Sequence, residues 1–245
     1  MKRKKRKKNG VFCLRVQELA KRYATCLVGL FVMAFGITLM VDTGLGVSPI
    51  SSVPYVLNQQ FSFISLGMFT FLWNVVLILG QILILRKEFK PLELLQLPLS
   101  FLFGWFVDIC KWLLSGMVLS EYWMSLIVLL TGCLVLALGA CLTVLSQTVM
   151  NSGEAFVNAV SRKTGKVFGN IKVVFDVSLV AIAVILSLVF FGRIEGVREG
   201  TVIAALVSGF IIRALSRWIG PLLNRWYHAG SISVPLEEQP VGQES

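Results

Sequence analysis

The residues most able to do chemistry in this sequence are charged side chains inside long apolar runs. Asp108, Asp176 and Arg213 each lie in such a run. If the runs cross a bilayer, each charge costs about 2.5–3.5 kcal/mol on insertion scales and needs a partner or a function. Local ion pairs are one interpretation, because Lys111 and Lys172 lie one helical turn from the two aspartates. The other is that Asp108 and Arg213 face the interior and line or gate a cavity.

A second group of candidates is polar but uncharged. Asn74 and Gln81 are seven residues apart, so they share one face of a helix, with Thr70 nearby. They either hydrogen-bond to neighbouring helices, at roughly 0.6–2 kcal/mol each, or contact a solute. The sequence leaves both interpretations open.

Two candidate helix N-termini offer a different kind of site. Ser48 is followed by Pro49, and Asn151 is followed three residues later by Glu154, which resembles a capping box. The backbone N–H groups and positive dipole end of such a helix attract carboxylates and phosphates. An interfacial helix with a good cap is the alternative. The candidate substrate-binding residues are Ser48, Asn74, Gln81, Asp108, Asn151, Asp176 and Arg213.

Signals for enzymatic chemistry are weak. The only histidine, His228, is close to the C-terminus, which argues against a metal site or a His-based triad within the membrane. Residues 46–50 lack the second glycine of a nucleophile elbow, and no phosphate-binding loop occurs. The five cysteines have neither CxxC nor metal-ligand spacing, so we expect buried thiols without disulfides. We therefore expect no enzymatic activity, no catalytic residue, no metal and no cofactor.

These side chains must be positioned by membrane-spanning helices. Of the 245 residues, 56% are hydrophobic and 15% charged, whereas soluble domains have about 45–50% and about 25%. About 20 apolar residues in a helix cross the hydrocarbon core of a bilayer. The sequence therefore predicts an all-α membrane protein with six transmembrane helices, at about 22–41, 64–85, 94–116, 122–145, 172–191 and 200–220.

Positive charge is concentrated at the N-terminus, where residues 1–22 hold ten of the 23 Lys and Arg residues. We expect residues 1–21 to be a cytoplasmic arm that touches anionic lipid headgroups, with no nucleic-acid partner. The Lys and Arg residues of alternate connections place both termini, including a tail at 221–245, in the cytoplasm. The loop at 192–199 is a weak violation, because Arg193 and Arg198 lie on the opposite side.

Two connections, 42–63 and 146–169, are too long and too apolar to be simple loops. Each is predicted to contain a short helix, near 48–58 and near 151–161. Such a helix lies in the membrane interface or enters the membrane and returns, where protein or a water-filled cavity must surround it.

The two halves of the chain correspond in order. A shift of 103 residues places 34–36 on 137–139 and Ser48 on Asn151, and a shift of 102 places 73–74 on 175–176. A shift of 105 places Asp108 on Arg213. Each unit, 22–116 and 122–220, contains three spans and a short helix, and an odd number of spans turns the second unit upside down. The sequence thus predicts a 3+3 inverted repeat, as in many secondary transporters.

The same residues carry a resemblance to a known family. The sequence resembles the YczE/YyaS/YitT-type bacterial integral membrane proteins over most of residues 25–220, at Gly44-Leu45-Gly46-Val47-Ser48-Pro49-Ile50, Pro54-Tyr55, Leu66-Gly67, Asn74, Gln81, Leu94-Leu95-Gln96, Phe103-Gly104 and Asp108. The resemblance implies a multi-pass protein of the bacterial inner membrane. It brings no catalytic or substrate-binding residues with it.

The function that we expect is the binding and movement of a small solute by alternating access, with one repeat rocking against the other. One alternative is a non-transporting accessory or scaffold protein. Another is the solute-binding membrane subunit of a multi-component transporter. A transporter needs a polar cavity near the midplane, whereas a scaffold has a filled core. The expected partners are the lipid bilayer and an unidentified small solute, and the sequence is compatible with an oligomer.

Overall fold

The computed structural model describes residues 2–89, 91–117, 121–194 and 196–228. Side chains are described over these ranges except at 2–16, 92, 199, 203, 206–210, 213 and 224. Within these ranges the regular structure is helical, as predicted. The α-helices are α1 (Lys2–Asp42), α2 (Pro49–Gln60), α3 (Leu66–Leu85), α4 (Gln96–Leu113), α5 (Tyr122–Ser146), α6 (Ser152–Thr164), α7 (Phe168–Phe191) and α8 (Glu199–His228), with short 3₁₀ turns at Arg86–Glu88 and Pro91–Leu95.

Five helices in the described part of the chain are long and apolar enough to cross a membrane. They comprise Gln17–Asp42 of α1, Leu66–Glu88, Glu93–Leu113, Tyr122–Ser146 and Phe168–Phe191. The predicted sixth span, 200–220, lies on α8, where several side chains are outside the described set. The predicted span 22–41 is the second half of one continuous helix, because α1 begins within the basic arm.

Both predicted short helices are present, as α2 and α6. Ser48 and Asn151 occupy the N-cap positions, and Pro49 is the first helical residue of α2. The predicted capping bonds are wrong, because neither side chain makes a cap hydrogen bond. The Ser48 hydroxyl instead bonds to the Ser51 hydroxyl at 3.0 Å.

Helices α1 and α5 pack at very close range through glycines. A Cβ at Gly29 would lie 3.0 Å from the carbonyl oxygen of Gly139, and one at Gly36 would lie 2.9 Å from that of Gly132. The earlier glycine of α1 therefore meets the later glycine of α5, and the later meets the earlier. The two helices consequently run in opposite directions, and their backbones touch where a larger residue would separate them.

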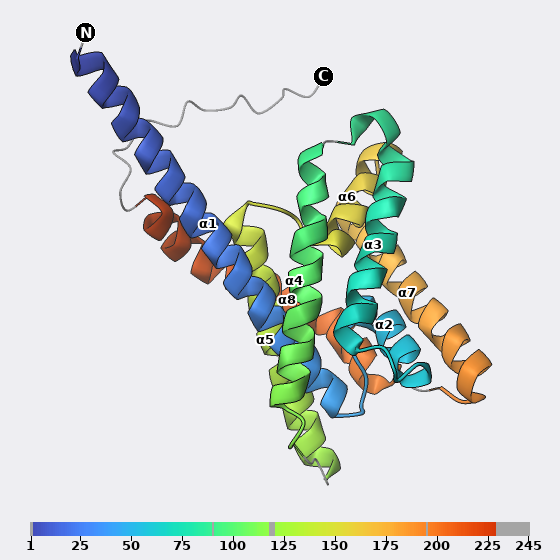
Figure 1. The fold of residues 1–245 in the computed structure, drawn as a ribbon. Helices are drawn as coiled ribbons and strands as arrows, with labels where there is room; N and C mark the ends of the chain where they lie inside the picture. Colours follow the sequence, from blue (N-terminus) through green and yellow to red (C-terminus); the bar gives the residue numbers. More distant parts are fainter. Residues whose placement is uncertain (1, 90, 118–120, 195, 229–245) are drawn as a thin grey trace.

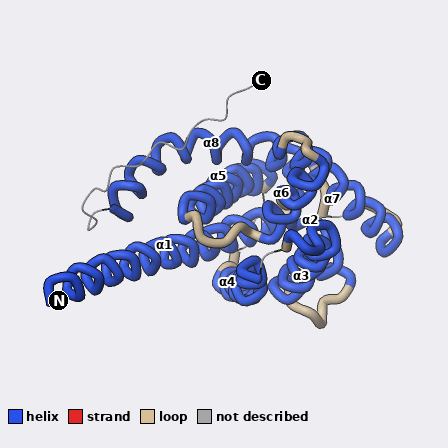
Figure 2. The backbone as a smooth tube through the Cα atoms, turned by 90° about the horizontal axis from the view of Figure 1, so that it is seen from above, coloured by secondary structure: helices blue, strands red, loops and turns tan. Residues whose placement is uncertain are grey.

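The other helices surround this pair in two groups (Figures 1 and 2). Helix α5 lies between α1 and α8, and α4 packs on α1. The short helices α2 and α6 each contact both α3 and α7. Helix α3 is joined to α4 at Gly67 and Gly104, whose backbones are in direct contact.

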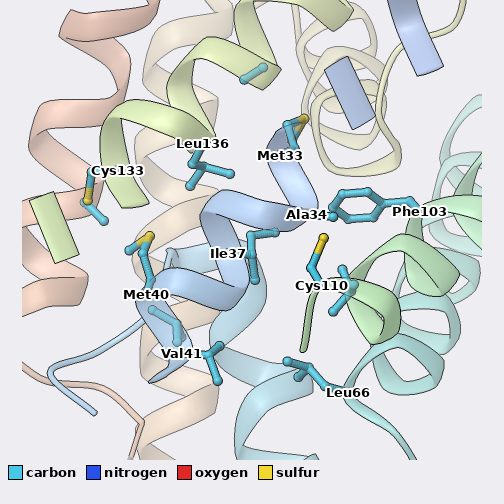
Figure 3. Close-up of a cluster of buried hydrophobic side chains, with 14 of the residues drawn as sticks. Met33, Ala34, Ile37, Met40, Val41, Leu66, Phe103, Cys110, Cys133 and Leu136 are labelled. Carbon is cyan, nitrogen blue, oxygen red and sulfur yellow. The ribbon is translucent and has the colours of Figure 1, made fainter. Parts of the chain in front are cut away.

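Apolar side chains fill most of the space between α1, α4 and α5. Figure 3 shows Met33 and Ile37 of α1 near Leu136 of α5 and Phe103 of α4, and all four belong to one buried cluster. The cysteines with described side chains, Cys26, Cys110, Cys133 and Cys141, are free and buried. This confirms the expectation of buried thiols without disulfides for these four.

The ends of three long helices meet at one end of the bundle. Lys21 on α1 donates to the Trp226 carbonyl of α8 at 3.0 Å. Arg22 donates to the Gln147 side chain after α5 at 3.1 Å and lies over the Tyr227 ring at 4.7 Å. The start of the α1 span and the end of α8 therefore lie on the same side of the molecule, as Figure 1 also shows.

Candidate functional site

The candidate site is a central cavity of about 110 Å³ to which every α-helix contributes. Its wall combines apolar residues of α1 and α5 with polar residues of α2, α3, α6 and α7. The polar lining consists of Ser48, Ser51, Thr70, Trp73, Asn74, Asn151, Glu154, Lys172 and Asp176. Four of the seven predicted site residues meet here: Ser48, Asn74, Asn151 and Asp176.

Two helix N-termini meet at this cavity. Ser48 and Asn151, the N-caps of α2 and α6, both line it. The first turns of the two helices touch, since the Ile50 side chain occupies the place that a Cβ at Gly153 would take. The N-terminal end of a helix carries about half a positive charge and unsatisfied N–H groups. Two such ends raise the electrostatic potential in the same small volume.

The charged groups of the cavity come from α6 and α7. Lys172 donates to Asp176 at 2.6 Å, which confirms the predicted ion pair one helical turn apart. Glu154 faces the same space from α6 and is partly buried. Burial raises the pKa of the Glu154 carboxyl, with Lys172 opposing this effect and Asp176 adding to it.

Two hydrogen-bond donors beside the cavity have no partner. Trp73 and Asn74 both line it, and Asn74 is only 3% exposed. The Trp73 Nε1 and Asn74 Nδ2 atoms are buried and make no hydrogen bond to any described residue. A buried donor without an acceptor costs about 1–3 kcal/mol. Such groups in a native structure call for an explanation, and binding of a ligand is one.

The lining residues fall into pairs separated by the same shifts as the two halves of the sequence. A shift of 103 relates Met33 to Leu136, Ile37 to Ala140, Ser48 to Asn151 and Ser51 to Glu154; a shift of 102 relates Thr70 to Lys172 and Asn74 to Asp176. The members of each pair both line the cavity. Their chemistry differs, because all the charges are in the second half, opposite hydroxyl and amide groups in the first.

Gln81 lies away from this cavity. It donates to Gln96 at 3.2 Å and to the Ser152 carbonyl at 3.1 Å, and it lines a separate pocket near Glu93 and Arg162. Of the two roles expected for Gln81, hydrogen bonding between helices and contact with a solute, the structure therefore shows the first. Asn74, on the same face of α3, lines the central cavity instead.

The predicted pairing of Asp108 with Lys111 is wrong. Lys111 pairs with Asp42 at the end of α1. Asp108 instead accepts hydrogen bonds from the Ser65 hydroxyl at 2.6 Å and from the Gly67 backbone N–H at 2.8 Å. Asp108 thereby caps the start of α3, where its negative charge opposes the positive end of the helix dipole. The side chain of Arg213, on α8, lies outside the described residues.

Sequence reasoning did not select Trp73 or Glu154 as site residues. The Asn-x-x-Glu spacing places Glu154 in a capping box, and Trp73 enters only through the match of residues 73–74 with 175–176. The correspondence between the two halves of the sequence could have identified Glu154. Applied to every polar residue, the shift of 103 pairs Ser51 with Glu154, and the shift of 102 pairs Thr70 with Lys172.

Comparisons with known proteins place the chain in a family. Residues 20–217 match the model of a family of unknown function, DUF6198. The chain is 26% identical over 200 residues to the uncharacterized membrane protein YczE of Bacillus subtilis (strain 168), covering 80% of this chain and 86% of that protein. It is 24% identical over 205 residues to the uncharacterized protein YyaS of the same organism, covering 82% and 92%. No solved structure matches.

The YczE- and YyaS-type resemblance is thereby confirmed, whereas its YitT-type part stays a prediction. The apolar helices agree with the printed description of YczE as a membrane protein, and they imply a lipid environment. The chain is a membrane protein that belongs to the DUF6198 family.

Proposed function

We propose that the protein is a small-solute transporter that binds its solute in the central cavity and works by alternating access. The observation that carries this proposal is the cavity lining. Six pairs of residues at equivalent positions in the two halves of the chain line one small cavity, and four of these pairs are polar. Binding sites of inverted-repeat transporters lie at the interface between repeats, at the ends of short or broken helices.

The proposal includes a 3+3 inverted repeat of residues 22–116 and 122–220. The α1–α5 contact supports it. The shift of 103 relates Gly29 to Gly132 and Gly36 to Gly139. In the structure Gly29 contacts Gly139, the counterpart of Gly36, and Gly36 contacts Gly132, the counterpart of Gly29. Reciprocal contacts of this kind are what a two-fold axis produces. Since the two helices are antiparallel, such an axis runs across them and therefore in the plane of the membrane.

The proposal also includes α8 as a sixth span, with both termini in the cytoplasm of a bacterial inner membrane. Helix α8 has 30 residues, about 45 Å at 1.5 Å per residue, which is enough to cross a bilayer. The contact of Lys21 and Arg22 with Trp226 and Tyr227 supports placing the two ends on one side. The Lys and Arg distribution supports the cytoplasmic side.

The cavity is also what separates a transporter from a scaffold. A protein that only supports a neighbour has no need for ionisable groups and buried, unpartnered donors at its centre, because each of them costs stability. The Lys172–Asp176 pair, Glu154, Trp73 and Asn74 all lie at this place. The proposal is therefore solute binding and movement, with no enzymatic step.

Alternating access is tested by the chemical accessibility of a cysteine in the cavity. The background replaces the five native cysteines, and Thr70→Cys places one thiol in the lining. A membrane-impermeant thiol reagent is added to intact cells or to inside-out vesicles. We expect Thr70→Cys to react in both preparations, because the cavity opens to each side in turn.

The matched control is Leu72→Cys, two residues away on the same helix, where the side chain is 44% exposed on the apolar surface. We expect it to react in neither preparation, because lipid excludes the reagent. Reaction of Thr70→Cys from one face only, or from neither, would contradict alternating access. It would favour the accessory or solute-binding-subunit alternatives.

A further inference from the structure

We infer that the solute of the central cavity carries a carboxylate, which Trp73, Asn74 and the N-termini of α2 and α6 recognise. This inference rests on the proposed function, since it names the substrate class of the same site. It begins from the hydrogen-bond donors beside the cavity, because some of them have no acceptor in the protein.

Trp73 Nε1 and Asn74 Nδ2 are the clearest of these donors. Both donors are buried, both residues line the cavity, and neither donor has a partner among the described residues. An indole N–H can only donate, so a solute group that pairs with Trp73 must be an acceptor. In this conformation both N–H groups have almost no accessible surface, so contact with a solute requires the two side chains to reorient toward the cavity.

The short helices add donors of a second kind. The caps Ser48 and Asn151 both line the cavity, and neither side chain makes a cap hydrogen bond. In α2, Pro49 has no N–H and the Ser51 N–H donates to the Ser48 carbonyl at 2.9 Å, so α6 contributes more free N–H groups than α2 does. Backbone N–H groups at a helix N-terminus bind negatively charged oxygens through both hydrogen bonds and the dipole. Because the first turns of α2 and α6 touch at Ile50 and Gly153, both N-termini lie beside the same cavity, where an anion would feel both dipoles.

The charged side chains refine this assignment. Lys172 is already paired with Asp176 on its own helix. The lining residues of α2 and α3 carry no charge, and Glu154 on α6 has only Lys172 and Asp176 as charged neighbours in the lining. A solute with an ammonium group next to its carboxylate would place that group at Glu154. A simple carboxylate would instead require a proton on Glu154, because two negative charges in this small space repel each other.

The cavity limits the size of the solute. Its volume of about 110 Å³ is several times the about 10–15 Å³ that one buried water molecule requires on the same measure. Carboxylates of a few non-hydrogen atoms therefore fit. Acetate and glycine represent the two forms, without and with an ammonium group.

The test is ligand-induced thermal stabilisation of the full-length protein in lipid nanodiscs. The probes are acetate and glycine, their neutral amides acetamide and glycinamide, and ethylammonium. We expect at least one carboxylate to raise the melting temperature in a saturable manner, and its amide to have no effect. Stabilisation by glycine alone would assign the ammonium group to Glu154. Stabilisation by acetate that weakens as pH rises would assign the proton to Glu154.

Two substitutions remove the donors while keeping the shape. Trp73→Phe deletes the indole N–H, and Asn74→Leu replaces the amide by an apolar group of similar size. Each should weaken carboxylate binding about tenfold or more. Neither should lower the melting temperature of the ligand-free protein, because a buried donor without a partner costs stability, and removing it lifts that cost. Trp105→Phe is the matched control, since Trp105 is 57% exposed on the surface.

Four results would overturn the inference. No carboxylate could bind, the amides could bind as tightly as the acids, ethylammonium could be the only probe that binds, or both variants could bind like the unmodified protein. A loss of ligand-free stability with unchanged affinity would show that Trp73 and Asn74 are structural. If Thr70→Cys reacts from both faces but no carboxylate binds, the transport proposal is supported and the carboxylate inference is contradicted. If a carboxylate binds and Thr70→Cys reacts from one face only, the carboxylate inference is supported and the transport proposal is contradicted.

Discussion

At the scale of single residues, polar side chains inside the bundle divide into those with partners and those facing the cavity. The sequence identified most of these positions, because a charge or an amide within an apolar run is conspicuous. It could not identify every partner. Lys111 was paired with Asp108 on its own helix, yet its partner is Asp42 on α1, which is 69 residues earlier. Lys172 and Asp176, four residues apart, were paired correctly. Helical spacing predicts local pairs but carries no information about contacts between helices.

A prediction at this scale concerns Glu154, whose pKa is raised above its ordinary value of 4.5 by burial. As pH rises above that value, the carboxyl ionises more readily in the unfolded chain than in the native protein. The native state is therefore increasingly penalised until the pH passes the raised pKa. Glu154→Gln removes this penalty, so we expect it to raise the melting temperature by about 2–4 °C at pH 8 and by much less at pH 5.

Thermal unfolding in detergent at the two pH values measures this effect. Glu121→Gln is the control, because Glu121 is exposed at the N-cap of α5, so losing its charge should leave the melting temperature unchanged or lower it slightly at pH 8, opposite to the gain expected for Glu154→Gln. A gain for Glu154→Gln that is equal at pH 5 and pH 8 would contradict the assignment of a raised pKa.

At the scale of elements, the two short helices were predictable because Ser-Pro and Asn-x-x-Glu mark helix starts within otherwise apolar connections. Their bounds differ from the prediction by one to three residues. The close packing of α1 on α5 was not predictable in the same way. Glycines within a span are common in membrane helices, and only the structure identifies Gly29, Gly36, Gly132 and Gly139 as contact points. By contrast Gly169, the counterpart of Gly67 in the sequence, has open space around it.

This contrast predicts that alanine substitutions at Gly36 and Gly169 change the free energy of unfolding in different ways. Gly36→Ala places a methyl group against the backbone of α5, so we expect a loss of about 1–3 kcal/mol in the free energy of unfolding. Gly169→Ala meets no atom within 4 Å and gains helix propensity, so it should be neutral or stabilising by up to about 1 kcal/mol. Unfolding of both variants in mixed micelles provides the comparison. Equal effects would show that the α1–α5 contact is looser than described.

At the scale of the whole molecule, side chains of different elements contact each other at both ends of the bundle. On one side Arg162 of α6 lies 4.0 Å from Glu88 and Glu93. On the other side the Phe61 and Phe190 rings, after α2 and on α7, are 5.9 Å apart between centroids. The composition predicted the membrane class, and the order of spans and caps predicted where the two halves would meet. The cavity itself could not be predicted, because it depends on which side chains of all the helices fill the centre.

The most direct test of this account is a pair of spin–spin distances measured by double electron–electron resonance in lipid. Labels at Lys87 and Lys163 span one side of the bundle; Gln60 and Val189, their counterparts by the shifts of 102 and 103, span the other. All four positions are exposed. Rocking of two inverted halves predicts that each pair has a short and a long distance, and that a change of pH or solute lengthens one pair while it shortens the other. A single fixed distance at both pairs, or changes in the same direction, would contradict alternating access around the central cavity.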